Sequence, residues 1–289
     1  RGGRRVASAG FDDNTARVWD LESGATLHTL KGHTGSVWSV TCFDRGGGWV
    51  IVTASDDKTA RVWDLESGAA RRTLQHPDEV KSIACWGVAG GWVIVSGCDD
   101  NNAYVWDGES GAMRRTLAGH TGDVWSVACA GVAGGWIIAS ASDDKTARLW
   151  DGESGAARQT FEGHTSFVVA VDCVVVAGEL RVVTGSLDKT ARVWGERGAL
   201  LTLKHAKEVC SVAGVVAGDL WRVMSGDKSG AVRVWDGASG ARLLALDGHK
   251  GAVLSLAVHK MDDGWRVASG STDDKVRVWE IHGALAGLR

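Results

Sequence analysis

The sequence is poor in proline, in long apolar runs and in net charge. Pro77 is the only proline among 289 residues, whereas glycine occurs 40 times. Glycine at about twice its usual share of ~7% marks frequent tight turns rather than a disordered linker. The longest apolar run, residues 167–177, is interrupted by Asp172 and is too short to cross a bilayer. A net charge of −3 gives no general reason to bind nucleic acid or an anionic membrane, and a short basic run at residues 1–5 does not change that. We therefore expect no nucleic-acid partner and no membrane.

Motifs for metal, disulfide and nucleotide chemistry are also lacking. There are six cysteines but no C-x-x-C pair, and a chain of this length does not need disulfide bonds for stability. Four cysteines share one position of the repeat described below and two fall elsewhere: Cys42, Cys85, Cys129 and Cys173, then Cys98 and Cys210. We interpret all six as reduced, buried core thiols and expect neither a metal site nor a cofactor. Neither G-x-x-x-x-G-K-[ST] nor G-x-G-x-x-G is present, so the glycine runs at 46–48, 90–91 and 134–135 are interpreted as hairpin turns.

What the sequence does contain is a repeat. The stretch from Ser55 to Asp64 returns in six further versions, and its closing Trp recurs at spacings of 44, 43, 44, 44, 41 and 44 residues. These residues are Trp19, Trp63, Trp106, Trp150, Trp194, Trp235 and Trp279. A His recurs with nearly the same period, at His33, His76, His120, His164, His205 and His249. A constant period of this size predicts a repeat architecture.

One unit shows the expected plan. Residues 37–42, 49–54, 59–63 and 69–74 are short β-branched segments separated by Gly, Asp and Ser clusters, which predicts four antiparallel strands. Residues 49–52 are apolar at consecutive positions, so both faces of each sheet must be covered. Sheets stacked face to face around an axis form a β-propeller. The sequence therefore predicts an all-β, seven-bladed propeller of four-stranded antiparallel blades.

The units resemble those of the WD-repeat family. Most units have Gly-His near their start, Ser or Thr on the second strand, Asp in the next turn and Trp-Asp closing the third strand, although Gly195 and Glu280 follow Trp194 and Trp279, and the resemblance covers essentially the whole chain. It implies that the His, Ser/Thr, Asp and Trp of each unit hydrogen-bond within the blade. The sets carried over are His33, Thr53, Asp57, Trp63; His76, Ser96, Asp100, Trp106; His120, Ser140, Asp144, Trp150; His164, Thr184, Asp188, Trp194; and His249, Ser269, Asp273, Trp279.

Two units depart from this pattern. Ser229 stands at the Asp position of the Trp235 unit, so we expect His205 to lose its charged anchor and that blade to be the weakest interior one. The turn before Trp19 is one residue longer, which is expected to place Ser8 out of register. Because few residues precede that turn, the first blade should have three strands and lack its innermost one, while residues 284–288 supply the fourth strand of the last blade.

Catalytic and binding interpretations of the repeated residues have structural alternatives. Ser, His and Asp are the residue types of a hydrolase triad, but a set that recurs five times favours a structural role that satisfies buried polar groups. A second series of tryptophans begins the second strands, at Trp49, Trp92, Trp136, Trp221 and Trp265. They could form a binding belt, but packing between blades is favoured.

Function must then come from surfaces. The leading hypothesis is a non-catalytic, intracellular scaffold, in the cytoplasm or nucleus, that binds peptide segments of partner proteins. Because the chain begins with Arg1 rather than Met, residues 1–289 are expected to be a single propeller from a longer chain. The alternatives are therefore an accessory propeller of a larger enzyme or signalling protein, and a substrate-receptor adaptor of a ubiquitin ligase. Such adaptors often carry Arg two residues after Trp-Asp, where this chain has Glu22, Glu66, Glu109, Glu153 and Ala238.

The resemblance also implies a peptide-binding top face. In that family it is built by the residues three and five positions after the His and by the residue before the turn Asp. The residues carried over are Asp12, Ser36, Trp38, Asp56, Glu79, Lys81, Asp99, Asp123, Trp125, Asp143, Phe167, Leu187, Glu208, Leu254 and Thr272. Carboxylates beside tryptophan suit Lys or Arg, so we predict a preference for basic peptides that weakens with salt. The alternative is that Asp-Asp is a solvated turn dipeptide copied with the repeat, although this does not explain the acids on the other loop.

Overall fold

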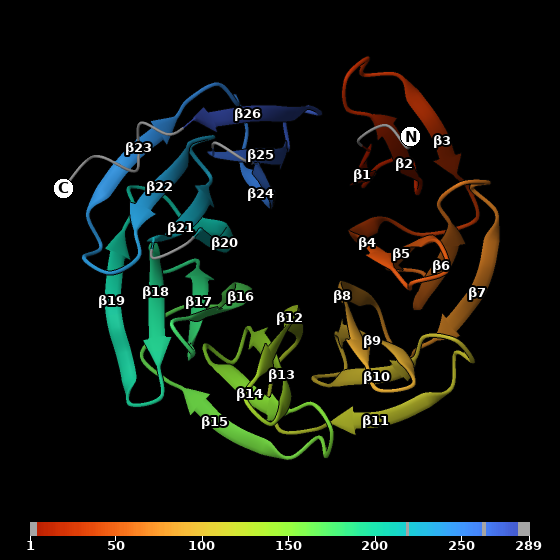
Figure 1. Ribbon diagram of the computed structural model, residues 1–289, viewed down its shortest axis with the longest axis horizontal. Coiled ribbons are helices and arrows are strands. Elements are labelled where there is room, and N and C mark those ends of the chain that lie inside the picture. Colours follow the sequence, from red (N-terminus) through yellow and green to blue (C-terminus); the bar gives the residue numbers. More distant parts are fainter. Residues whose placement is uncertain (1–4, 218–219, 262–263, 283–289) are drawn as a thin grey trace. The chain divides into compact units, whose positions relative to one another are not determined.

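The computed structural model describes residues 5–217, 220–261 and 264–282, and these residues form 26 strands in seven antiparallel sheets (Figure 1). The first three sheets are β1 (Arg5–Ala9), β2 (Ala16–Asp20), β3 (Thr26–Leu30); β4 (Val37–Asp44), β5 (Trp49–Ser55), β6 (Thr59–Asp64), β7 (Ala70–Gln75); and β8 (Val80–Val88), β9 (Gly91–Cys98), β10 (Ala103–Asp107), β11 (Met113–Leu117). The next two are β12 (Val124–Val132), β13 (Gly135–Ser142), β14 (Ala147–Asp151), β15 (Ala157–Phe161); and β16 (Val168–Val176), β17 (Glu179–Ser186), β18 (Thr190–Gly195), β19 (Gly198–Lys204). The last two are β20 (Val209–Ala217), β21 (Leu220–Asp227), β22 (Val232–Asp236), β23 (Arg242–Leu246); and β24 (Val253–Met261), β25 (Gly264–Ser271), β26 (Val276–His282).

These sheets are the seven blades of an all-β propeller, so the predicted fold class is confirmed. The first blade has three strands, as expected, and no counterpart of β4 is found in the described part of the chain. The expected fourth strand of the last blade, at residues 284–288, lies outside the described residues. Contacts divide the chain into two compact units. Unit 1 runs up to Cys129 and includes Gly155–Ala157, and unit 2 comprises Ala130–Ser154 and the residues from Arg158 onward.

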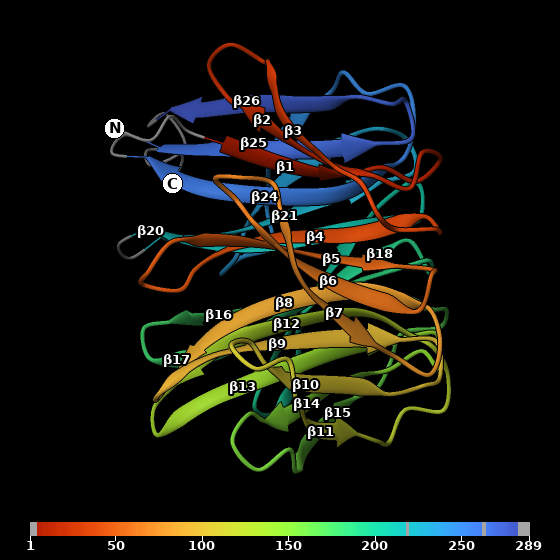
Figure 2. The same cartoon turned by 90° about the vertical axis from the view of Figure 1, so that its right-hand side faces the viewer.

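The core of unit 1 lies between neighbouring sheets, which Figure 2 shows as successive layers. Val50, Val52 and Val62 of one sheet pack against Ile83 and Ile94 of the next, and all five are buried. Each such side chain contributes about 1.5–3 kcal/mol by leaving water. This is why the second strands are apolar at consecutive positions rather than alternating.

Two kinds of tight turn shape each blade. Gly46, Gly90 and Gly134, in the hairpins between first and second strands, have φ of 78°, 82° and 87°, as the glycine runs predicted. After the turn Asp, Lys58, Lys145 and Lys189 also have positive φ, of 62°, 72° and 69°. The second turn therefore reverses the chain directly after the Asp.

Three expectations about individual residues need correction. Ser8 pairs with Arg17 just as Thr53 pairs with Arg61, and the indole of Trp19 donates to the Ser8 hydroxyl at 2.8 Å. The prediction that Ser8 is out of register is therefore wrong, because the extra residue is taken up in the turn.

The cysteines are all free thiols, but they are not all buried. Cys98 and Cys173 are buried, Cys85, Cys129 and Cys210 are half-buried, and Cys42 is exposed. Cys42 lies on β4, whose neighbouring sheet β1–β3 has no described strand equivalent to β4 that could cover it. The expectation of a core thiol is therefore wrong for Cys42.

The second tryptophan series is buried in four of its five members. Trp92, Trp136, Trp221 and Trp265 are 3–7% exposed, whereas Trp49 is 46% exposed. A Cβ added to Gly108, Gly152 or Gly237 would lie 2.1–2.2 Å from the ring of Trp92, Trp136 or Trp221, so each of these indoles rests on a glycine. The equivalent residue beside Trp49 is Leu65, which is itself buried and occupies that place. The expected packing role is therefore wrong for Trp49.

Candidate functional site

The repeated His, hydroxyl, Asp and Trp form a hydrogen-bonded chain, best seen in the sheet β4–β7. Nδ1 of His33 lies 2.8 Å from Asp57 Oδ2, and its Nε2 lies 2.7 Å from Thr53 Oγ1, which accepts from the Trp63 indole at 2.9 Å. Since Asp57 accepts from Nδ1–H, the unprotonated Nε2 accepts from the Thr53 hydroxyl. Asp57 also accepts from the backbone N–H of Thr34 at 3.1 Å. Every polar atom of this buried chain therefore has a partner.

Burial decides between the catalytic and the structural interpretation. The His33 side chain is 0% exposed and that of Asp57 is 5% exposed, so no substrate reaches them. Burial lowers the pKa of His33, against the effect of Asp57, and keeps the ring neutral. Burial alone would raise the pKa of Asp57, but hydrogen bonds from Thr59, His33 and Thr34 hold it below its usual value. His33, Thr53, Asp57 and Trp63 therefore have a structural role, and we call such a set of His, hydroxyl, Asp and Trp a clamp.

The same chain recurs in other sheets. His164 lies 2.7 Å from both Asp188 and Thr184, and His249 lies 3.0 Å from Asp273 and 2.8 Å from Ser269. The indoles of Trp194, Trp279 and Trp150 donate to Thr184, Ser269 and Ser140 at 2.8, 2.9 and 2.8 Å.

The sheet β8–β11 departs from the expected set at Asp100. His76 keeps its bond to Ser96 at 2.8 Å, but its Nδ1 lies 3.1 Å from the carbonyl oxygen of Leu74. Asp100 instead accepts from the Tyr104 hydroxyl and from the Asn102 backbone N–H. The residue after His76 is Pro77, which has no N–H to offer a carboxylate, whereas Thr34 supplies one in the neighbouring sheet. The expected bond between Asp100 and His76 is therefore not made.

The sheet β20–β23 corrects a second expectation. His205 does not lack a charged anchor, because Asp227 Oδ2 lies 3.0 Å from its Nδ1, and Asp227 also binds Arg233. Asp and Ser have exchanged positions here: Asp227 and Ser229 stand where Ser55 and Asp57 stand in β4–β7. Burial opposes the charge, but bonds from His205 and Ser229 together with Arg233 hold the pKa of Asp227 well below its usual range. The sequence signal was an Asp two residues after the strand Ser.

The expected peptide-binding positions meet in pairs across a backbone hydrogen bond. In each pair the residue before the turn Asp, or its equivalent, donates its N–H to the carbonyl of the residue three positions after the His, at 2.9–3.0 Å. These pairs are Asp56 with Ser36, Asp99 with Glu79, Leu187 with Phe167, Lys228 with Glu208, and Thr272 with Ala252. Two of the three positions in these blades therefore lie at one edge of the sheet.

In unit 1 these positions gather around Lys81. Its ammonium lies 2.7 Å from Asp56, 3.3 Å from Asp99, and 4.7 and 5.7 Å from the ring centres of Trp38 and Trp125. It also binds Glu79, and the Trp38 indole donates to Asp56. The two indoles meet edge to face at 5.9 Å. We call Trp38, Asp56, Glu79, Lys81, Asp99, Asp123 and Trp125 the Lys81 cluster.

The Lys81 cluster holds more carboxylates than cations. The Lys81 side chain is only 5% exposed, and although burial opposes its charge, hydrogen bonds to Asp56 and Glu79 raise its pKa to about 12. Burial raises the pKa of Asp99 to about 6, against the effect of Lys81 and with that of Asp123. Oδ1 of Asp99 and Nε1 of Trp125 are buried without a hydrogen-bond partner among the described residues. Lys81 therefore lies inside the acidic and aromatic surface rather than opposite it.

Outside the cluster the remaining positions are more varied. Asp12 is exposed, and beside it Phe11, which the sequence reasoning missed, is 54% exposed and packs edge to face on Trp38 at 4.9 Å. In unit 2, Phe167 and Leu254 are 42% and 50% exposed, Thr272 is exposed, and Asp143, Leu187 and Glu208 are half-buried. The signal for Phe11 was an aromatic residue directly before the Asp-Asp turn of the first blade.

No group of three or more His, Cys, Asp or Glu side chains placed to hold a metal ion occurs in residues 5–217, 220–261 and 264–282. No helix in that same part of the chain is long and apolar enough to span a membrane.

The blades and their clamps define a repeat propeller, and comparison with known proteins gives its family. Five segments match the family described as WD domain, G-beta repeat: residues 24–64, 68–107, 111–151, 155–195 and 240–280. Together they cover more than half of the chain, which belongs to the WD40 repeat family. Propellers of this family serve in general as protein-interaction modules. Trp19 and Trp235, which close the two departing units, lie outside the matched segments.

Two curated relatives match locally. F-box/WD repeat-containing protein 7 of Drosophila melanogaster is 57% identical over 37 residues, which is 13% of this chain and 3% of the relative. F-box/WD repeat-containing protein sel-10 of Caenorhabditis elegans is 50% identical over 34 residues, which is 12% of this chain and 6% of the relative. The chain thus spans a small fraction of the length of the curated relatives it matches.

Proposed function

We propose that this propeller is a non-catalytic scaffold inside the cell that binds peptide segments of partner proteins, and that it prefers segments containing Lys or Arg. The binding surface is formed by the Lys81 cluster together with the other expected positions. The observation that carries the proposal is Lys81 itself, whose ammonium is held by Asp56 at 2.7 Å and lies 4.7 Å from the Trp38 ring. The surface thus has the chemistry that a basic side chain needs.

Charge supports a second cation at this surface. Asp56, Glu79 and Asp99 all bind the single ammonium of Lys81, which leaves these four side chains net negative. Glu79 also binds Lys81 but is 40% exposed and so remains accessible, whereas the Asp56 carboxylate binds both Trp38 and Lys81. Surface charges are screened over about 8 Å at physiological salt. Binding of a basic peptide should therefore weaken as salt is added.

An array of basic and acidic peptides of equal length, probed at two salt concentrations, tests the proposal. The Glu79→Gln/Asp123→Asn variant should bind basic peptides at least about fivefold more weakly than the wild type, since each lost contact is worth roughly 0.5–1 kcal/mol. A matched control, Glu22→Gln/Glu196→Gln, removes the same charge from turns at the opposite sheet edge and should bind like the wild type. Equal binding of basic peptides by wild type and the first variant, or a preference for acidic peptides, would contradict the proposal. Asp56→Asn is less informative because it disturbs the bonds of that carboxylate to both Trp38 and Lys81, whereas Glu79→Gln disturbs a single bond to Lys81.

A second candidate function is the adaptor of a ubiquitin ligase. It is favoured by the local likeness to two relatives whose names combine an F-box with WD repeats. Against it, Glu109 and Glu153, at positions where such adaptors often carry Arg, accept hydrogen bonds from Trp92 and Trp136 and are committed to the blades. The amino-acid sequence upstream of Arg1 distinguishes the candidates, since an F-box there would support the adaptor and a catalytic domain would make this an accessory propeller.

A further inference from the structure

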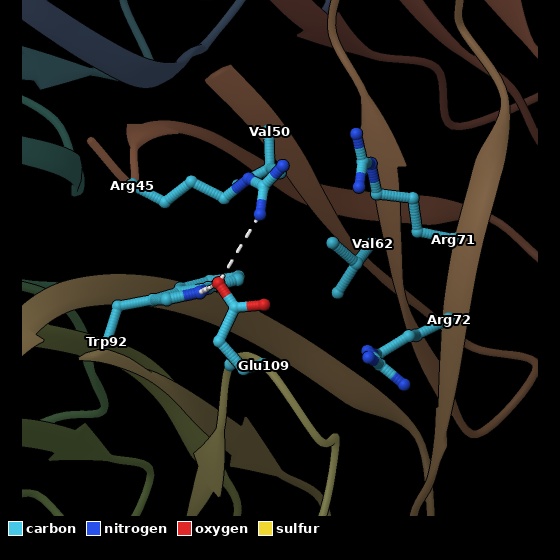
Figure 3. Close-up of a pocket in the computed structure, with 8 residues that line it drawn as sticks. Arg45, Val50, Val62, Arg71, Arg72, Trp92 and Glu109 are labelled. Carbon is cyan, nitrogen blue, oxygen red and sulfur yellow. Dashed lines mark hydrogen bonds and ion pairs between the residues drawn. The ribbon is translucent and has the colours of Figure 1, made fainter. Parts of the chain in front are cut away.

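A pocket of about 230 Å³ lies between the sheets β4–β7 and β8–β11 of unit 1 (Figure 3). Its lining residues are Arg45, Val50, Val62, Arg71, Arg72, Trp92, Gly108 and Glu109. Arg45 follows β4, and Gly108 and Glu109 follow β10, so the pocket opens at the sheet edge opposite the His–Asp clamps. It is therefore separate from the Lys81 cluster.

The three arginines of this pocket differ in how far they are neutralised. Arg71 is held by Asp64 through Nε at 3.1 Å and through a second guanidinium nitrogen. Arg45 has only a long contact of 3.4 Å to Glu109, and its Nε is buried without a hydrogen-bond partner in the described structure. Within the described part of the chain, Arg72 donates only to the uncharged carbonyl of Ser110, at 3.2 Å. Arg45 and Arg72 thus face a single carboxylate, which leaves this pair of guanidiniums with a net positive charge.

A second pocket, of about 300 Å³ in unit 2, provides an internal comparison. It has the same place between two blades, and it contains Arg158, the counterpart of Arg71, which is likewise held by an aspartate, Asp151. Val132 replaces Arg45 and Gln159 replaces Arg72. Arg71 and its aspartate therefore have a counterpart in the second pocket, whereas Arg45 and Arg72 distinguish the first pocket from the second, although Arg115 stands at the position of Arg72 in β11.

We propose that Arg45 and Arg72 bind an oxyanion, the carboxylate or phosphate of a partner's side chain, in the pocket between β4–β7 and β8–β11. In Figure 3 Arg45 extends from the left over Glu109 and Arg72 lies on the right-hand side of Glu109, while Val62 and the indole of Trp92 also line the space. Planar guanidiniums bind carboxylate and phosphate through two parallel N–H donors. At about 30 Å³ per water, the space holds such a group with several waters. This inference does not rest on the proposed peptide surface.

A titration with inorganic phosphate and, separately, acetate at constant ionic strength tests the site. The indole N–H of Trp92, which donates to Glu109 at 3.0 Å, is the NMR reporter, and it can be assigned with Trp92→Phe. We expect a saturable shift in the wild type and an affinity at least about tenfold lower in Arg45→Val/Arg72→Gln. Val and Gln already stand at these positions beside the second pocket, so this variant should fold, which its melting temperature will show.

Two further variants make the result decisive. Glu109→Gln removes the competing carboxylate and should raise the affinity for phosphate a few-fold, and Val132→Arg/Gln159→Arg should create binding in unit 2. Tighter binding of phosphate than of acetate identifies a phosphorylated side chain as the ligand, and comparable binding identifies an acidic one, both of which support the oxyanion site. An unsaturable shift in the wild type, or equal affinity in the Arg45→Val/Arg72→Gln variant, overturns it.

Discussion

The sheets β4–β7 and β8–β11 are neighbours in one unit and carry the same chain of His, hydroxyl and Trp, yet only the first is anchored by its aspartate. Asp57 binds both the ring of His33 and the N–H of Thr34, whereas Asp100 binds Tyr104 and leaves His76 to a backbone carbonyl. The bonds from His to hydroxyl and from Trp to hydroxyl are nearly equal in length in the two sheets.

This difference separates the two parts of the clamp. The hydrogen bonds that join the His and the Trp through a Ser or Thr hydroxyl lie within one blade. They are kept in β8–β11, where Ser96 binds both His76 and Trp106 although Asp100 does not bind the His. The anchor, by contrast, is a question of which acceptor satisfies Nδ1–H. In β20–β23 a third solution appears, in which Asp227 reaches the His from the strand end. A buried donor needs an acceptor, but not one from a fixed position.

The largest effect is expected where the anchor is most deeply buried. Asp227→Ala removes a side chain that is 0% exposed and strands both His205 and Arg233, so we expect a loss of about 3–5 kcal/mol in unfolding free energy. Urea denaturation at pH 7 measures it. Ser229→Asp is the control: it places a second carboxylate beside Asp227 and should destabilise modestly rather than improve the blade. A loss below about 1 kcal/mol for Asp227→Ala would show that Asp227 is not the anchor.

The comparison between the two neighbouring sheets gives the next effect. Asp57→Ala, or the equivalent Asp188→Ala, should cost roughly 2–4 kcal/mol because it strands a buried His and a backbone N–H. Asp100→Ala should cost only about 0.5–1.5 kcal/mol, since His76 keeps its partner. Denaturant midpoints of the three variants decide it. Equal losses of unfolding free energy for Asp57→Ala and Asp100→Ala would show that the bond from Asp57 to His33 does not set the two sheets apart.

Acid should affect the sheet β8–β11 through His76. Burial lowers the pKa of His76 to about 4. Because the unfolded chain binds this proton from about pH 6.5 downward while the folded chain does not, unfolding free energy falls as pH falls toward 4. The loss between pH 7 and 4.5 is about 2–3 kcal/mol. Comparing the wild type with His76→Gln at both pH values isolates this contribution. An unchanged pH dependence in His76→Gln would mean that His76 is not the group responsible.

The smallest change in unfolding free energy is expected for a substitution of Pro77. Pro77→Thr restores the backbone N–H that Thr34 provides in the neighbouring sheet, but it also frees the unfolded chain, which costs about 0.4–1 kcal/mol. The net change should lie within about 0.5 kcal/mol. A double-mutant cycle with Asp100→Ala is more telling, since Asp100 should matter more by about 0.5–1 kcal/mol in the Thr background. A coupling energy of zero would show that the missing N–H is not the reason why Asp100 does not bind His76.

The repeat pattern was sufficient to predict the architecture. A period near 44 residues, apolar second strands and Gly or Asp turns leave few alternatives to stacked four-stranded blades, because each strand must bury both faces and each turn needs its own backbone geometry. The three-stranded first blade also followed from counting residues. These features depend on the pattern of residue types and on segment lengths, both of which can be read directly from the sequence.

Which acceptor each buried donor uses, and where the charges meet, depends on how the strands and blades pack. Asp227 and Asp100 both lie near a His, but Asp227 binds the His ring and Asp100 binds Tyr104, because local signals such as Pro77 take effect only through the distances between strands. Lys81 could be placed on the acidic face from the sequence, yet its burial between Trp38 and Trp125 depends on how neighbouring blades pack. The pairing of Arg45 with Arg72 across a pocket is a product of the same packing.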